Sequence, residues 1–92
     1  MIALIARSSD GRRAFYLWQD PPTTEQGTTS GWNFAVEENS DDGEVRPVFD
    51  TWHETLDEIL MYPPSYSDEP LHWQDETTGN LVDPAALSRA AS

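Results

Sequence analysis

Aromatic side chains are the feature that most limits how this chain can fold. The sequence contains no cysteine, so no disulfide can hold it together, and only 37% of its 92 residues are hydrophobic. Four Trp, three Tyr and three Phe are spread along it, and each large aromatic ring buries about 150–250 Å² when it enters a core. A few rings can therefore build one modest core, which predicts a single folded domain over residues 1–92 rather than a disordered acidic chain.

The first half of the sequence predicts an antiparallel sheet. Residues 1–20 hold two apolar runs on either side of the polar sequence 8–11, Ser-Ser-Asp-Gly, which is typical of a β-hairpin. Residues 21–31 are rich in Thr, Gly and Gln and predict an exposed loop. Residues 32–37 then alternate between large apolar and small or polar side chains, which indicates a strand with one buried face.

The second half predicts one main helix over residues 51–61. Thr51 is a favourable N-cap, and Glu54 three residues later completes a capping box. Four apolar side chains at helical spacing form one stripe, which we expect to pack on the sheet. Pro63 and the proline after it end the helix. The apolar stripe consists of Trp52, Leu56, Ile59 and Leu60.

The last third of the sequence adds shorter elements. Residues 71–74 are consistent with a final strand that turns at residues 78–80. Asp83 followed by Pro84 is typical of an N-cap and first helical position, which predicts a short helical turn over residues 85–87. The expected fold class is therefore α+β: a small antiparallel β-sheet of three to four strands with one main α-helix packed on one face.

Charge decides which partners are possible. Seventeen acidic residues face five Arg, with no Lys, for a formal net charge of −12. Such a surface repels nucleic acid and anionic membranes and attracts basic proteins from a distance. Arg7, Arg12 and Arg13 flank the turn of the first hairpin, but three cations are too small a patch to bind phosphates against this field. We expect no direct nucleic-acid binding and assign these arginines no role.

The sequence shows no constellation that points to catalysis. It has no glycine-rich phosphate loop and no nucleophile elbow. Residues 38–43 faintly follow a calcium loop, but Phe49 stands where that loop needs its bidentate Glu. His53 and His72 are the only histidines, and a metal enzyme built on them is the weakest reading. We expect a protein that is not an enzyme and that has no metal or cofactor.

The sequence also favours a cytoplasmic protein. No segment approaches the ~20 apolar residues of a membrane span. The N-terminal apolar run, Ile2 to Ala6, is too short for a secretory signal, and its basic residue follows the run instead of preceding it.

An acidic band over residues 37–58 is the main candidate for partner binding. On the predicted helix, four of its acids would form an outward stripe with a spacing of about 6 Å per turn, which can imitate a line of phosphates. Two tyrosines in the loop after the helix are the predicted exposed aromatic anchors, because interfaces are enriched in Tyr. The predicted partner-binding residues are Glu37, Glu38, Asp41, Asp42, Glu44, Asp50, Glu54, Asp57, Glu58, Tyr62 and Tyr66.

These features together favour a small acidic inhibitor or immunity-type protein. It would bind and mask a basic, nucleic-acid-binding site on a partner such as a nuclease, a toxin or a nucleic-acid-guided complex, as an antitoxin or a phage anti-defence protein does. The alternative is a small housekeeping or regulatory protein-interaction domain from an acid-rich proteome, halophilic or GC-rich. In that case the charge serves solvation and not recognition.

Overall fold

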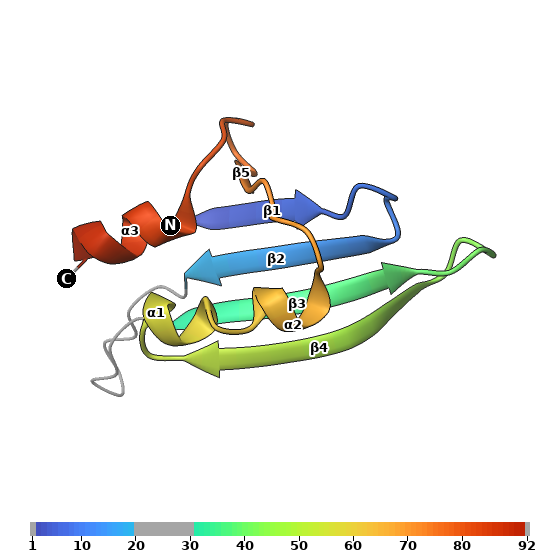
Figure 1. Ribbon diagram of the computed structural model, residues 1–92, viewed down its shortest axis with the longest axis horizontal. Helices are drawn as coiled ribbons and strands as arrows, with labels where there is room; N and C mark the ends of the chain where they lie inside the picture. The colour runs from blue at the N-terminus through green and yellow to red at the C-terminus, as the bar shows by residue number, and fades with distance from the viewer. Residues whose placement is uncertain (1, 20–30, 92) are drawn as a thin grey trace.

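The structure, a computed structural model, describes residues 2–19 and 31–91, with side chains up to Leu87. A five-stranded antiparallel sheet carries three short helices on one face (Figure 1). The strand order is β4-β3-β2-β1-β5, so the first four strands pair with their neighbours in the chain. The elements are β1 (Ala3–Arg7), β2 (Arg13–Gln19), β3 (Trp32–Asn39), β4 (Val45–His53), α1 (Leu56–Ile59), α2 (Pro63–Tyr66), β5 (Gln74–Asp75) and α3 (Pro84–Ala91).

The predicted α+β class is confirmed, but the sheet has five strands where three to four were expected. The strand that the sequence missed is β4, because residues 51–53 at its end were assigned to the predicted helix. The final strand predicted at residues 71–74 is present as β5, which has only two residues and pairs with the free edge of β1. Among the described residues, no helix is long and apolar enough to cross a membrane.

The core lies between the sheet and the helices. Side chains that face each other across neighbouring strands point to the same side, so Leu17 and Phe34 share a row, as do Phe15 and Val36. All four are fully buried. Ile59 of α1 is buried with them, as are the other members of the core, Leu4, Ala6, Trp32, Leu56 and Trp73. The alternation predicted for residues 32–37 is therefore confirmed.

The two tight hairpins use the same turn. In the first, Asp10 accepts hydrogen bonds from the Ser8 hydroxyl (2.6 Å) and from the Arg12 amide (2.9 Å). In the second, which joins β3 and β4, Asp42 accepts from the Ser40 hydroxyl and from the Glu44 amide. The glycine after each aspartate has a positive φ, 73° and 86°, which other residues adopt at a cost. The hairpin predicted for residues 1–20 is confirmed, whereas the loop predicted for residues 21–31 lies, apart from Gly31, outside the described residues.

The predicted main helix over residues 51–61 is wrong. Strand β4 runs through this segment as far as His53, and Thr55, not Thr51, caps the four-residue helix α1 by accepting a hydrogen bond from the Glu58 amide. Trp52 faces away from the core and is 47% exposed. The chain contains two consecutive capping patterns, Thr51 to Glu54 and Thr55 to Glu58, and pairing with β3 decides between them because it satisfies the backbone of residues 51–53.

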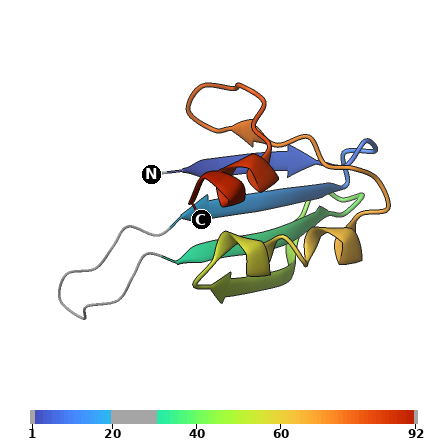
Figure 2. The ribbon, with the colours of Figure 1, turned by 60° about the vertical axis from the view of Figure 1, so that its left-hand side comes forward.

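The C-terminal segment matches its prediction more closely. The Asp83 carboxylate accepts a hydrogen bond from the Ala85 amide at 3.0 Å, as expected of the N-cap of α3. The helix is longer than predicted and continues to Ala91. Figure 2 shows α1, α2 and α3 on the same side of the sheet.

Candidate functional site

The sheet face opposite the helices is the main candidate surface, and no described element covers it (Figure 2). Cross-strand pairing places Ala3, Trp18, Asn33 and Trp52 in one row. The next row contains Ile5, Tyr16, Ala35 and Asp50, and Glu37 follows in the third. Glu76, which comes directly after β5, donates its amide to the Ala3 carbonyl at 3.0 Å and so extends the first row. We call this surface the open face: Ala3, Ile5, Tyr16, Trp18, Asn33, Ala35, Glu37, Asp50, Trp52 and Glu76.

The open face is apolar at its centre and acidic at its border. Ala3, Ile5, Tyr16 and Trp18 are half-buried, although no described helix covers them. Three carboxylates border this centre on different sides: that of Asp50 on the edge strand β4, that of Glu76 beyond β1, and that of Glu37 towards the β3–β4 hairpin. An apolar centre with a charged border resembles the anatomy of protein interfaces.

A hollow of about 360 Å³ lies on the open face between Tyr16 and Trp18. Glu37 and Glu76 are the charged residues that line it. Burial raises the pKa of the Tyr16 hydroxyl, and the negative charge of Glu37, its hydrogen bond to Tyr16 and the charge of Glu76 raise it further. The positive charge of Arg7 lowers the pKa of Tyr16. Two carboxylates therefore act on the hydroxyl of Tyr16 at this hollow.

Trp52 stands at one corner of the open face. Its indole ring lies so close to Gly31 that a Cβ at this glycine would fall about 2.1 Å from the ring. A side chain at residue 31 would therefore displace the ring. The missing side chain lets Trp52 lie flat against the backbone while half of its surface remains in water.

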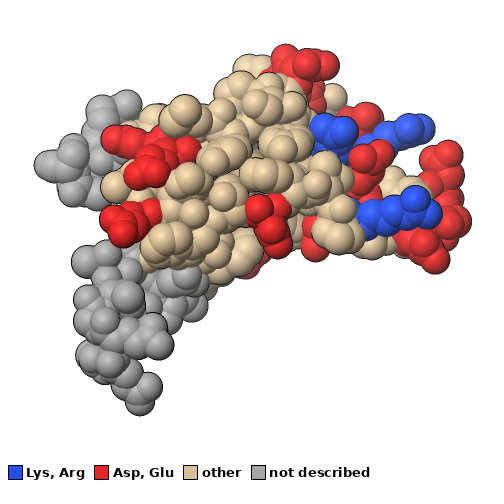
Figure 3. All heavy atoms as spheres, turned by 90° about the horizontal axis from the view of Figure 1, so that it is seen from below, with Lys and Arg blue, Asp and Glu red and all other residues tan. Residues whose placement is uncertain are grey.

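The acidic band of residues 37–58 is divided by the fold. Its hairpin part lies beside arginines: Asp41 is 3.8 Å from Arg12, and Glu44 is 3.8 Å from Arg46. Glu38 makes the same contact with Arg13. In Figure 3, blue and red atoms are mixed at one end of the molecule, and red atoms stand alone towards the other end of the visible face. The hairpin end is thus partly neutralised, although Asp42 adds a further carboxylate there.

The remaining acids of the band do not form the predicted helical stripe. Asp50 lies on β4, Glu54 lies in the bend after it, and Asp57 belongs to α1. Glu58 holds the local structure together, because its carboxylate contacts the His53 ring at 2.9 Å and the Thr55 hydroxyl at 3.1 Å. The predicted stripe required a helix over residues 51–61, and the structure has a helix only at Leu56–Ile59, so these acids do not line one helical face.

The prediction that Tyr62 and Tyr66 form an exposed anchor is also wrong. Both rings are half-buried against Phe49, with ring centroids 5.2 and 5.0 Å from it. The Tyr62 hydroxyl contacts His53 at 2.8 Å, and the Tyr66 carbonyl accepts a hydrogen bond from Arg13 at 2.7 Å. The exposed large aromatic is instead Trp52, at 47%, which the sequence assigned to the apolar stripe of the predicted helix. Trp18 is half-buried on the open face, and the apolar character of both faces of residues 15–18 was the available signal for that face.

The two histidines cannot share a metal ion. His53 ends β4, whereas His72 lines a small hollow with Ile5 and Arg7 of β1. Three strand spacings, or about 14 Å, separate β4 from β1. Both ring nitrogens of His53 are already engaged, by Glu58 and Tyr62. Within residues 2–19 and 31–91, no group of three or more His, Cys, Asp or Glu residues is arranged to hold a metal ion.

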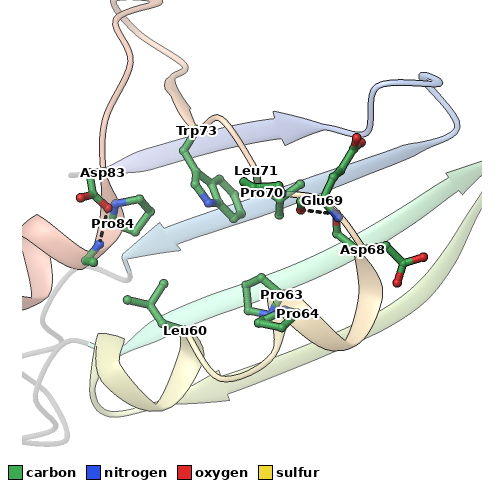
Figure 4. Close-up of a pocket in the computed structure, with 12 residues that line it drawn as sticks. Leu60, Pro63, Pro64, Asp68, Glu69, Pro70, Leu71, Trp73, Asp83 and Pro84 are labelled. Atoms are coloured by element: carbon green, nitrogen blue, oxygen red, sulfur yellow. Dashed lines mark hydrogen bonds between the residues drawn. The ribbon is translucent and has the colours of Figure 1, made fainter.

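A second hollow, of about 520 Å³, lies on the helical side between α2 and the start of α3 (Figure 4). Trp73 lies among Pro63, Pro64, Pro70 and Pro84, which come from three separate parts of the chain. Its acidic residues include Asp83, which caps α3, and this hollow shows no nucleophile beside a base. Sequence reasoning missed it because its prolines are brought together only by the tertiary fold.

Comparisons with known proteins identify no relative: no family model, no curated protein and no solved structure matches this chain.

Proposed function

We propose that this protein is a non-enzymatic, cytoplasmic inhibitor of the immunity type. It binds a basic, nucleic-acid-binding site on another protein and masks it. The observation that carries the proposal is the open face, where an apolar aromatic centre is bordered by the carboxylates of Glu37, Asp50 and Glu76. A nuclease, a toxin or a nucleic-acid-guided complex presents the opposite surface, in which cations surround the path of the nucleic acid.

Charge and aromatic area have separate tasks in this proposal. The net charge of −12 accelerates encounter with a basic partner. Trp18, Trp52 and Tyr16 then supply contact area, and residues of this type dominate binding energy at interfaces. The hairpin end contributes less, because Arg12, Arg13 and Arg46 already lie beside its acids. We therefore expect the contact at the open face and not along the whole acidic band.

The test compares two matched charge reversals. Asp50→Lys with Glu76→Lys reverses exposed acids of the open face, and Asp41→Lys with Glu44→Lys reverses exposed acids of the hairpin end. Both double variants change the net charge equally, so long-range attraction is the same in both. Tagged wild-type protein and both variants are used to capture proteins from native lysate in low salt. A salt step releases the bound proteins, and mass spectrometry identifies them.

We expect wild type and the hairpin variant to retain one basic nucleic-acid-binding protein, which the open-face variant loses. The purified partner should bind wild type with a Kd at least about 100-fold lower than that for the open-face variant, since close charge pairs at interfaces contribute several kcal/mol. Adding wild type in equimolar amount should also block the partner's binding to nucleic acid. Equal loss in both variants would place the contact elsewhere, and a partner whose nucleic-acid binding is unaffected would contradict masking.

A further inference from the structure

The hollow between Tyr16 and Trp18 has room for one flat side chain, and we call it the slot. Only Leu17 separates the two residues on β2, so both lie on the open face, about 7 Å apart along the strand. A planar group makes van der Waals contact at about 3.5–4.0 Å from each neighbour. The spacing of the two residues and the volume of about 360 Å³ therefore leave room for one such group, beside the small residues Ala3 and Ala35 that also line the hollow.

Both ends of this slot are acidic. Glu37 pairs with Ala14, one row beyond Tyr16, while Glu76 lies beyond β1 in the row of Trp18. Among the side chains that the structure describes, Arg7 is the cation that acts on Tyr16, and it belongs to the same row as Glu37. Of these described groups, one arginine therefore faces two carboxylates, which leaves the slot with a net negative charge.

We propose that this hollow binds an arginine side chain of the basic partner, stacked between Tyr16 and Trp18, where the negative charges of Glu37 and Glu76 both attract its guanidinium. Arginine suits this hollow because its planar guanidinium stacks on aromatic rings and its N–H donors match the geometry of a carboxylate. The inference rests on the proposed function in that the arginine belongs to the masked basic site.

Other occupants fit the hollow less well. A neutral apolar side chain would remove water from Glu37 and Glu76 without replacing their hydrogen bonds, which costs free energy. A second copy of this chain carries the same net charge of −12 and would be repelled. Its arginines Arg12, Arg13 and Arg46 also lie beside acids of their own hairpin end.

The test uses small probes and needs no partner. N-acetyl-arginine N-methylamide is titrated into isotope-labelled protein, and the Trp18 indole N–H is followed by NMR. The citrulline analogue, which has nearly the same shape and no charge, is the matched probe. We expect saturable shifts at Trp18 with arginine and at least about tenfold weaker binding of citrulline.

Three variants locate the arginine site. Glu37→Gln with Glu76→Gln keeps the shape of the hollow and removes its charge, so arginine should then bind no better than citrulline. Asp41→Asn with Glu44→Gln removes the same charge from the hairpin end and should leave the preference for arginine unchanged. Trp18→Leu, which removes one wall, should abolish the saturable shifts. Dispersed amide spectra establish that each variant is folded.

Equal binding of arginine and citrulline to wild type, or shifts centred away from Trp18, would overturn the proposal. So would self-association of wild type in sedimentation that Trp18→Leu removes, because a second copy would then occupy the slot. Failure of the arginine slot can be told apart from failure of masking. If the variant Glu37→Gln with Glu76→Gln still captures the partner, the arginine slot is wrong and masking stands.

Discussion

At the scale of single residues, the two tryptophans Trp52 and Trp73 have opposite roles. Trp73 is 5% exposed and packs in the core, whereas Trp52 is 47% exposed on the open face. Trp73→Ala should lower the free energy of unfolding by about 3–5 kcal/mol because it leaves a cavity. Trp52→Ala should lower it by about 1 kcal/mol, since half of its area is already in water. Urea denaturation measures both, and similar losses would contradict the assignment of Trp52 to the surface.

Residue-scale patterns also show why the candidate site was only partly predictable. The acidity and the aromatic content are properties of composition, so the sequence predicted a basic partner and an aromatic contact. Which aromatics are exposed depends on which face of the sheet each strand residue occupies, and Trp18 and Trp52 lie in strands with apolar residues on both faces. The sequence therefore assigned Trp52 to the core, although it lies exposed on the open face.

At the scale of elements, the paired hairpin turns should make stability depend on pH. The Ser8 hydroxyl, and then the Arg12 amide, hold the pKa of Asp10 below its usual value, and Ser40 and Glu44 act in the same way on Asp42. A lowered pKa in the folded state stabilises the protein above the unfolded value of about 3.9. That contribution is lost as the pH falls from there through the lowered folded values.

The double variant Asp10→Asn with Asp42→Asn isolates this contribution. We expect it to be less stable than wild type at pH 7 and to lose less stability than wild type between about pH 5 and pH 2, because the two groups no longer titrate. Asp41→Asn is the control in the same turn, since its exposed ion pair with Arg12 contributes little. Urea midpoints across this pH range provide the measurement, and parallel curves for wild type and the double variant would refute the role of the turns.

The elements that the sequence predicted correctly are those with local signals. The first hairpin, the strand at residues 32–37 and the cap of α3 each depend on residues close together in the chain. The error at residues 51–61 arose because Thr51 and Thr55 both begin a capping pattern. Only the pairing of β4 with β3, a tertiary interaction, selects the second pattern, and such pairing overrides helix propensity.

At the scale of the whole molecule, the response to salt separates the proposed inhibitor from a domain adapted to an acid-rich proteome. We expect the isolated protein to remain folded at 0.01 M salt, with a Tm only a few degrees below that at 0.5 M, because three of its arginines already lie beside acids at one end. Near-ultraviolet circular dichroism during thermal melts gives the measurement. Unfolding at low salt with recovery at high salt would favour the alternative.

The order of strands in the sheet also sets an order of folding. Strands β1 to β4 pair with their chain neighbours and close short loops, whereas β5 reaches β1 from the far end of the chain. Loop closure therefore favours the four-stranded meander first. During synthesis this meander emerges with Phe15, Phe34 and Val36 uncovered, since α1, α2 and α3 follow later. The C-terminal third thus shields the nascent sheet from aggregation, and truncation within it would expose the core face while leaving most of the open face assembled.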